Sequence, residues 1–359
     1  MNARAALRER RPRWWVLGAA VGLFVVGGVA GGLIVDNAEP SSAGSNPDVC
    51  SATTVANDVL PTVVTIAVHT GSGGGTGSGE VIRSNGYILT NNHVISAAAN
   101  GGSIDVLFSD GRTATATLTG RDPQTDLAVI KVDRTRLPVI PFGSSENVVV
   151  GEPVVALGAP LGLYSTVTAG IVSALDRTIE VPGDHGMTAL LVSAIQTDAA
   201  INPGNSGGAL TNCSGQLIGV PTAGASVQNE LGQSSAGSVG IGFAIPVSIA
   251  RTVSDEIIST GSASHAFFGI SVTRIPATAA QQAGSPQGLY VQSVVTGGPA
   301  AHAGLREGDI ITKINGRAAT EPNQLAAVTL SERAGSRVSI TYERDGRSST
   351  TTVTLGSRP

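Results

Sequence analysis

The stretch Asn202-Pro203-Gly204-Asn205-Ser206-Gly207-Gly208-Ala209-Leu210 is the most informative part of the chain. It places one serine, Ser206, inside a run of glycines, where a backbone comes close to another group and leaves room for a substrate. Such a setting is typical of a nucleophile site. A serine hydroxyl alone is a poor nucleophile, so this interpretation requires a histidine base and an orienting carboxylate elsewhere in the chain.

Both partners occur upstream of Ser206. The segment Thr90-Asn91-Asn92-His93-Val94 follows an apolar stretch at 86–89, which predicts a strand that ends at His93 and a short helical turn over 95–99. Asp126 stands at the start of another apolar strand, 127–132. We predict that His93 is the general base and Asp126 the orienting acid. The order His, Asp, Ser is that of chymotrypsin-like proteases and differs from the orders in subtilisins and α/β-hydrolases.

Other residues compete for these roles. The chain has five histidines, and a lone histidine is more often a surface or structural residue, which is how we interpret His69, His185, His265 and His302. Asp105, Asp110, Asp122 and Asp133 compete with Asp126. Asp105 and Asp110 lie near a turn at 109–111 and Asp122 precedes a proline, so we interpret these three as solvated loop acids and prefer Asp126.

Three segments resemble signature blocks of the HtrA/Deg family of trypsin-like serine proteases: TNNHV (90–94), TDLAVIKV (125–132) and QTDAAINPGNSGGAL (196–210). The similarity covers roughly 55–355, and membrane-anchored actinobacterial members are the nearest likeness. The resemblance implies two six-stranded antiparallel β-barrels with a catalytic cleft between them. Short β-rich runs at 63–68, 104–108, 127–132 and 153–158, separated by turn residues, agree with this fold.

The expected fold is therefore mainly β, with a chymotrypsin-like double β-barrel protease domain over 55–255. A small α/β PDZ domain is expected over 265–357, and one transmembrane helix precedes both domains. The PDZ resemblance rests on Phe267-Phe268-Gly269-Ile270, 288–294 and 298–311. Backbone N–H groups at Phe268, Gly269 and Ile270 are expected to bind a peptide carboxylate, and the strand after them offers an edge for a bound tail. A helix over 321–330 places Leu325 in the pocket for the last side chain.

The oxyanion hole is expected from the backbone N–H groups of Gly204 and Ser206. Digestive serine proteases carry an aspartate before the nucleophile, which pairs with a newly cut N-terminus, whereas here the residue is the neutral Asn205. Activation by such a cut is therefore not expected. The family resemblance implies control by rearranging loops, and 161–168 and 177–191 are the candidate loops.

Substrate specificity is predicted from the residues around Ser206. Trypsin-like enzymes carry an acid six residues before the nucleophile, and here that residue is Ala200, so cleavage after Lys or Arg is disfavoured. The facing wall is apolar, which favours Val, Ala or Ile at the cut site, and consists of Ile241, Gly242, Phe243 and Ala244.

The N-terminal region predicts a membrane anchor. Residues 1–13 form an arginine-rich cytoplasmic tail, 14–35 carry no charge and are long enough to span a bilayer, and 36–54 form a linker rich in small polar residues. A cleaved signal peptide is the alternative. The protease and PDZ domains are then extracytoplasmic on a single-pass cell-membrane protein. In that oxidising compartment Cys50 and Cys213 can form a disulfide, two free thiols being the alternative.

Composition excludes several classes of function. The net charge is −4, and because residues 1–13 contribute +4, the rest of the chain carries −8, which gives no basic surface for nucleic acid. The glycine run 71–79 lacks the ending of a phosphate-binding loop and is interpreted as a mobile loop entering a strand. No metal and no organic cofactor is expected.

These observations predict a serine endopeptidase that cuts unfolded or damaged extracytoplasmic proteins, with a PDZ domain that binds peptide C-termini and regulates activity. The resemblance also implies a homotrimer. The alternative from another class is a PDZ-bearing chaperone or sensor whose protease fold is latent or inactive.

Overall fold

The computed structural model describes residues 50–71, 73–159, 166–182, 188–224 and 238–357. The expected cytoplasmic tail, transmembrane helix and all but the end of the linker fall in 1–49, outside the described residues. Parts of both candidate regulatory loops, 161–165 and 183–187, also lie outside them. Within the described ranges, no helix has the length and apolar character needed to span a bilayer.

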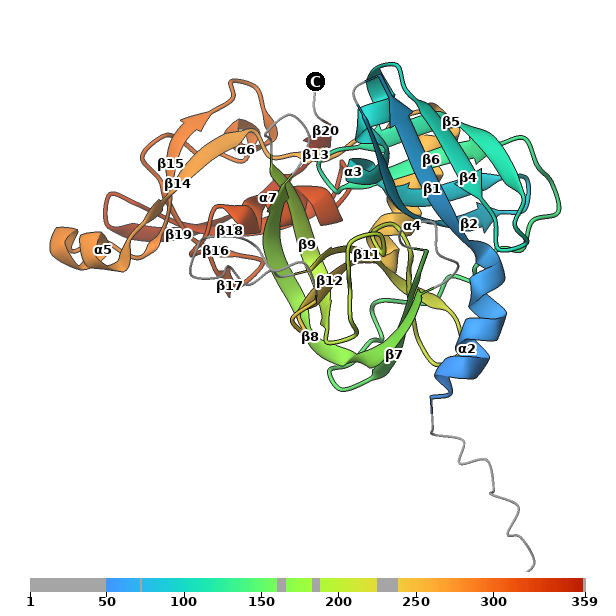
Figure 1. The fold of residues 1–359 in the computed structure, drawn as a ribbon. Coiled ribbons are helices and arrows are strands. Elements are labelled where there is room, and N and C mark those ends of the chain that lie inside the picture. Colours follow the sequence, from blue (N-terminus) through green and yellow to red (C-terminus); the bar gives the residue numbers. More distant parts are fainter. Residues whose placement is uncertain (1–49, 72, 160–165, 183–187, 225–237, 358–359) are drawn as a thin grey trace, which may run out of the picture. The chain divides into compact units, whose positions relative to one another are not determined.

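The first half of the protease domain is a closed six-stranded barrel with the strand order β1-β2-β3-β6-β5-β4 (Figure 1). Its strands are β1 (Val63–Thr70), β2 (Gly73–Arg83), β3 (Tyr87–Asn91), β4 (Ser103–Leu107), β5 (Thr113–Asp122) and β6 (Leu127–Val132). The helical segments after β3 are α3 (Asn92–Ile95) and the 3₁₀ turn η2 (Ser96–Asn100). Valine and isoleucine side chains from these strands fill the barrel, as their preference for pleated, half-buried surfaces leads one to expect.

The glycine run differs from its sequence interpretation, because 73–79 belongs to β2 and pairs with β1. The glycines allow close packing of the neighbouring strands and α3. A Cβ atom at Gly77 would lie 2.6 Å from a methyl group of Val94, and one at Gly79 would lie 2.7 Å from a methyl group of Ile88. The ladder to β1 satisfies the backbone, so most of the run is a strand and the loop interpretation is wrong there.

A second closed barrel follows, with the order β10-β11-β12-β9-β8-β7. Its strands are β7 (Pro153–Gly158), β8 (Thr166–Pro182), β9 (Thr188–Thr197), β10 (Ala209–Thr211), β11 (Leu217–Gly224) and β12 (Gly242–Pro246). The candidate loop at 177–191 is largely an extension of the β8–β9 hairpin, since Ile179 pairs with Leu191 and Glu180 with Leu190. The described residues of this candidate loop are therefore strand.

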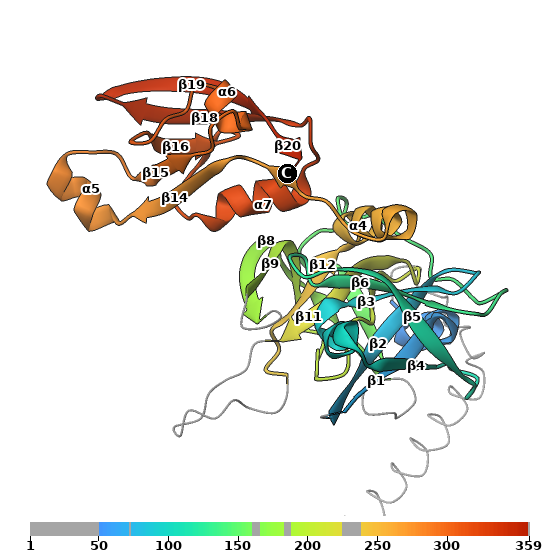
Figure 2. The same cartoon turned by 90° about the horizontal axis from the view of Figure 1, so that it is seen from above.

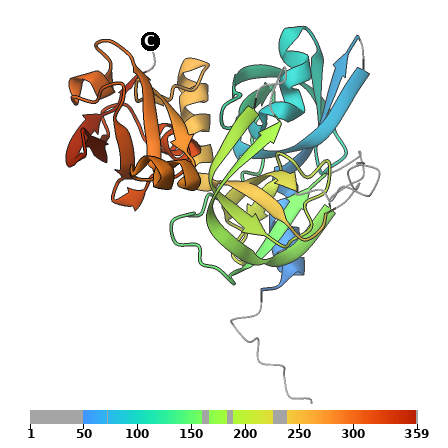
Figure 3. The same ribbon diagram turned by 90° about the vertical axis from the view of Figure 1, so that its left-hand side faces the viewer.

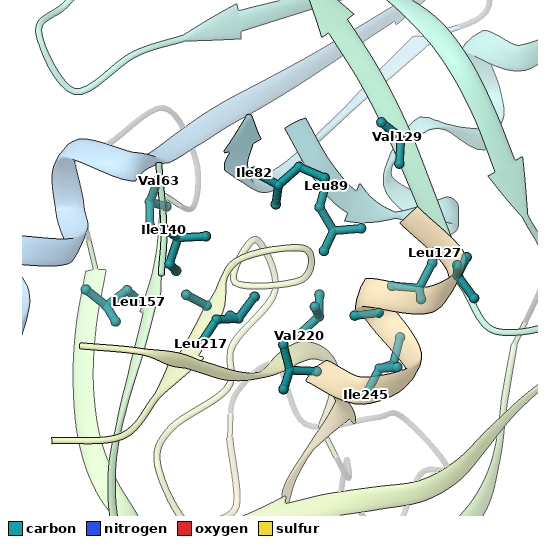
Figure 4. Packing of buried hydrophobic residues seen from close by; sticks show 14 of the residues in the cluster. Val63, Ile82, Leu89, Leu127, Val129, Ile140, Leu157, Leu217, Val220 and Ile245 are labelled. Carbon is teal, nitrogen blue, oxygen red and sulfur yellow. The ribbon is translucent and has the colours of Figure 1, made fainter. Parts of the chain in front are cut away.

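The two barrels lie side by side and share an apolar core (Figure 3). Figure 4 shows Val63, Ile82 and Leu89 of the first barrel opposite Leu157 and Leu217 of the second. Helices α2 (Ala52–Val59) and α4 (Val247–Thr260) contribute to the same core, and the 3₁₀ turn η1 (Leu60–Thr62) joins α2 to β1. This shared core fixes the two barrels, and hence the residues at their junction, relative to each other.

A disulfide joins Cys50, just before α2, to Cys213 in the turn after β10, with their Cα atoms 5.0 Å apart. It connects the start of the protease domain to the second barrel across 163 residues of sequence. A cross-link that closes so long a loop restricts the unfolded chain strongly.

Glu80 places a carboxyl group within the otherwise apolar shared core. Its cross-strand partners on β1 and β3 are Val63 and Leu89, and it is fully buried. Neither carboxyl oxygen has a hydrogen-bond partner among the described residues. Burial raises the pKa of Glu80 well above its usual value. The folded protein therefore holds Glu80 in its neutral form more strongly than the unfolded chain does.

Replacing Glu80 by leucine is predicted to stabilise the protein at pH 7.5, by an amount that shrinks towards pH 4. Below the unfolded pKa of about 4.5 both states are protonated. Above it the unfolded chain releases the proton while the fold retains it, so wild-type stability falls by about 1.4 kcal/mol per pH unit until the folded pKa is passed. Melting temperatures of the wild type and Glu80→Leu between pH 4 and 8 measure this difference.

The matched control is Glu146→Leu, because Glu146 is exposed and carries the same charge. Its effect on stability is expected to stay within about 0.5 kcal/mol. A gain from Glu80→Leu that does not depend on pH, or a loss at pH 7.5, would contradict the assignment of a neutral buried carboxyl group.

The C-terminal domain is built on a sheet with the order β14-β15-β16-β18-β19, which leaves β14 at the edge (Figure 2). Its strands are β13 (Ala266–Phe267), β14 (Ile270–Ile275), β15 (Gly288–Val294), β16 (Ile310–Ile314), β17 (Arg317–Ala318), β18 (Arg337–Arg344), β19 (Arg347–Thr354) and β20 (Gly356–Ser357). Its helices are α5 (Ala277–Ala283), α6 (Pro299–His302) and α7 (Asn323–Ser331). The domain has its own apolar core, which includes Phe268 and Leu325.

Candidate active site

The strand pairing of the first barrel brings His93 to Asp126. Strand β3 pairs with β6 along its length, with Asn91 opposite Leu127, so the residues that follow one strand meet those that precede the other. The carbonyl oxygen of Asp126 accepts hydrogen bonds from Asn91 Nδ2 at 2.8 Å and from the Asn92 N–H at 3.0 Å. Asp126 has φ 58°, a left-handed conformation that aspartate adopts more readily than most residues.

The Asp126 carboxylate is held on three sides. It accepts hydrogen bonds from the His93 backbone N–H at 2.9 Å and from His93 Nδ1 at 2.8 Å. The Thr222 hydroxyl donates a third, to the same oxygen that faces Nδ1. The side chain of Asp126 is 3% exposed and that of His93 is 37% exposed. The imidazole is therefore oriented by a buried acid while its far edge reaches solvent, which is the geometry of a general base.

Ser206 lies in the loop before β10, on the second barrel. Its hydroxyl donates to the Thr222 carbonyl at 3.3 Å, and the described residues show no hydrogen bond between Ser206 Oγ and His93. Thr222 thus contacts both Asp126 and Ser206. For His93 to accept the Ser206 proton, the O–H group has to turn from Thr222 towards the imidazole, and such hydrogen bonds often form only in the substrate complex.

The loop around Ser206 presents backbone N–H groups. Gly204 has φ 98° and Gly207 has φ 79°, conformations in which a side chain would be strained. The Asn205 N–H donates to Asn202 and the Gly207 N–H to Pro221. In the ranges that the structure describes, no protein group accepts the N–H of Gly204 or of Ser206. These are the two donors that the sequence analysis predicts for the oxyanion hole.

The predicted specificity residues lie on two neighbouring segments of the second barrel. The Ala200 carbonyl accepts hydrogen bonds from Asn205 Nδ2 and Thr168, which ties this residue to the nucleophile loop. Strand β12 carries Gly242, Phe243 and Ala244, with Gly242 opposite Thr197 of β9. Ala244 is buried in the barrel core, Phe243 is half-buried, and Ile241 before the strand is 38% exposed.

The structure adds Thr222, which the sequence analysis did not identify, and corrects the interpretation of Asp122. Thr222 lies on β11 of the second barrel, and its contact with Asp126 of the first barrel exists only where the two barrels meet. Asp122 was interpreted as a solvated loop acid, but it is 4% exposed. It accepts hydrogen bonds from the Gln124 N–H, the Thr125 hydroxyl and His265 Nε2. Asp122 therefore supports the turn that leads into Asp126.

In the C-terminal domain, Phe268, Gly269 and Ile270 form the entry into the edge strand β14. The carbonyls of Phe268 and Gly269 accept hydrogen bonds from Ala300 and Val295. Over the described part of the chain, the N–H groups of Phe268 and Gly269 have no protein acceptor. Gly269 has φ 79°, and the side chains of Phe268 and Leu325 are buried. These are residues that the sequence analysis predicts for the carboxylate-binding turn, and Leu325 belongs to the domain core.

Comparison with protein families supports the two-domain architecture. Residues 77–220 match the model of a trypsin-like peptidase domain, and 266–355 match that of a PDZ domain. The chain is 44% identical over 337 residues to serine protease PepD of Mycobacterium tuberculosis, covering 92% of this chain and 71% of that protein. It is 39% identical over 285 residues to a probable periplasmic DegP-like serine endoprotease of a Marinomonas species, covering 79% of this chain and 57% of the relative. The chain thus spans little more than half the length of the DegP-like relative.

Solved structures give the same result. The HtrA-type protease AlgW with a decapeptide is 34% identical, with a TM-score of 0.67 and coverage of 86% of this chain and 99% of AlgW. The serine endoprotease from Yersinia pestis is 34% identical, with a TM-score of 0.61 and coverage of 86% of this chain and 98% of that one. The family expected from the three sequence blocks is therefore confirmed. The chain belongs to the HtrA family of trypsin-like serine endopeptidases that carry a PDZ domain.

Proposed function

We propose that this endopeptidase uses Ser206 as its nucleophile, His93 as general base and Asp126 as the acid that orients His93. The observation that carries the proposal is the buried Asp126 carboxylate, which holds both His93 Nδ1 and the His93 backbone. An acceptor at Nδ1 keeps the imidazole proton there and leaves Nε2 free to take the serine proton. The imidazolium that forms is then stabilised by the same carboxylate.

The tetrahedral intermediate would place its negative oxygen against the N–H groups of Gly204 and Ser206. Two donors that are already oriented need no reorganisation as the charge develops. Such donors therefore contribute strongly to stabilising the transition state of acyl transfer. The loop conformation supports the assignment, and we propose that rearrangement of neighbouring loops controls access to it. No metal or cofactor takes part in this mechanism.

The substrates are proposed to be unfolded or damaged extracytoplasmic proteins, cleaved in protein quality control and the stress response. The name of the DegP-like relative places it in the periplasm, and AlgW is known with bound peptides. The N–H groups of Phe268 and Gly269, which have no acceptor among the described residues, bind C-terminal carboxylates in this proposal, and a bound tail pairs with β14. We further propose the single-pass anchor at 14–35, the extracytoplasmic location of 55–357 and a homotrimeric assembly.

The proposal predicts where an unfolded protein is cut. With Ala200 and the apolar β12 segment beside Ser206, the wild-type chain is expected to cleave unfolded casein after Val, Ala or Ile and to leave a stable folded protein intact. A basic residue at the cut site would need a partner charge that this wall does not supply. Mass spectrometry of the products identifies the cut sites, with Ser206→Ala as the control. Cuts mainly after Lys or Arg would contradict the pocket assignment.

A further inference from the structure

Ser78 on β2 of the first barrel contacts the nucleophile loop of the second barrel. The residue is fully buried. Its backbone N–H donates to the Ser206 carbonyl at 2.9 Å, and its hydroxyl lies 2.6 Å from the Gly204 carbonyl oxygen. These carbonyls belong to the two residues whose N–H groups form the proposed oxyanion hole. One residue of the opposite barrel therefore holds both ends of the segment 204–206.

The direction of the hydroxyl is fixed by a third contact. The Ala159 N–H, just after β7, lies 2.8 Å from Ser78 Oγ. An amide N–H can only donate, so the hydroxyl accepts from Ala159, and its own hydrogen points to the Gly204 carbonyl. The hydroxyl thus donates one hydrogen bond and accepts another, and both partners are backbone groups of the second barrel.

Packing around Ser78 leaves the loop little room to shift. A Cβ atom at Gly207 would lie 2.3 Å from the Ser78 carbonyl oxygen, and one at Gly158 would lie 2.7 Å from Asn205 Oδ1 and 3.1 Å from Ser78 Oγ. The Ser78 carbonyl also accepts from the Thr90 hydroxyl at 2.7 Å, on the strand that leads to His93. Ser78 therefore connects the Ser206 loop with the strand that carries the base.

We propose that Ser78 is a positioning residue for the oxyanion hole. The inference rests on the proposed catalytic role of Ser206. Gly204 has no side chain, so its two peptide groups rotate easily about the α-carbon. Fixing the Gly204 carbonyl with the Ser78 hydroxyl limits that rotation and keeps the Gly204 N–H directed at the substrate. Without the hydroxyl, the loop samples orientations in which this donor misses the developing oxyanion.

The expected effect of Ser78→Ala is on the chemical step. Misplacement of a catalytic donor costs about 10- to 100-fold in rate, so kcat for a peptide ending in valine should fall by that factor while KM changes little. A peptide boronic acid, which imitates the tetrahedral intermediate, should bind more weakly by a similar factor. Ser78→Cys keeps a weak donor and acceptor at the same place and should recover part of the rate.

Ser254→Ala is the matched control. Ser254 is also fully buried, its hydroxyl also bonds to a backbone carbonyl, that of Arg251 in α4, and it does not touch the nucleophile loop. Rates are expressed per active site titrated with a fluorophosphonate, so loss of folded protein does not appear as loss of kcat. Ser254→Ala should keep kcat within about twofold of wild type even if its melting temperature drops.

Amide hydrogen exchange of 202–208, measured by mass spectrometry in the full chain, provides a readout that does not depend on activity. Ser78→Ala should speed exchange in this segment, and Ser254→Ala should not. The proposal is overturned if Ser78→Ala keeps both kcat and exchange at wild-type values, or if both variants lose kcat equally. If Ser206→Ala still hydrolyses peptides, the proposed function fails, and the exchange comparison decides on Ser78 by itself.

Discussion

The full chain carrying Ser206→Ala is expected to hydrolyse a peptide substrate about 10⁶-fold more slowly than the wild type in kcat. The substitution removes the atom that forms the acyl bond and leaves only the contribution of substrate binding and the oxyanion donors. KM should change little, because the hydroxyl is one small group at the edge of the bound substrate. Steady-state kinetics on a fluorogenic peptide with valine at the cut site measure the effect.

The double variant His93→Ala/Ser206→Ala sharpens this prediction. Residues that act as one unit lose activity together, so the double variant should be no slower than either single variant. Ser214→Ala is the matched control, because Ser214 is an exposed serine in the turn after β10. Its rate should equal that of the wild type. A loss in Ser206→Ala below about tenfold would be incompatible with a serine nucleophile at this position.

Asp126→Asn is expected to lower kcat by about 10⁴-fold while the protein remains folded. The Asp126 carboxylate acts only as an acceptor. One of its oxygens accepts hydrogen bonds from both His93 Nδ1 and the Thr222 hydroxyl. An amide nitrogen in that place is itself a donor. The imidazole then has to accept at Nδ1, which puts its proton on Nε2 towards Ser206 and removes its ability to act as base.

The control for this variant is Asp133→Asn. Asp133 is exposed and directly follows β6, the strand that Asp126 precedes. It loses the same charge without touching His93 in the described structure, and its kcat should be unchanged. Thermal denaturation of both variants shows whether Asp126→Asn remains folded at the assay temperature. A kcat within tenfold of the wild type would mean that His93 does not depend on Asp126 for its orientation.

The three segments that we propose as catalytic could be selected from the sequence because each is a continuous motif. His93 follows a strand, Asp126 precedes one, and Ser206 lies among glycines, so local patterns suffice for each. The alternating and β-branched runs likewise predicted β1, β4, β6 and β7 close to their observed bounds. The family comparison agrees with this architecture.

Residues that act across the barrels could not be predicted in the same way. No sequence motif marks Thr222, and Ser78 lies inside the glycine run that suggested a loop. Their contacts with the opposite barrel arise only when the two barrels pack together. Glu80 follows a glycine-rich run, where a charged residue is normally solvated, yet the shared core buries it. Asp122 precedes a proline and suggested a loop, but Thr125 and His265 enclose it.

The glycine run and the β8–β9 hairpin show a related difficulty. Glycine has low strand propensity, so 73–79 suggested a loop, while the neighbouring strand β1 supplies a ladder that overrides this preference. The 177–191 segment contains polar and turn-forming residues, but much of it is strand because the end of β8 pairs with the start of β9. In both cases a tertiary partner determines the conformation.

The decisive experiment on the proposed nucleophile Ser206 is labelling of the full chain with a fluorophosphonate probe, followed by mass spectrometry of the labelled peptide. We expect a covalent adduct on Ser206 that is absent in Ser206→Ala and forms faster when peptides with free C-termini are added. An unlabelled wild type, even with such peptides present, would contradict it and favour a PDZ-bearing chaperone or sensor with an inactive protease fold.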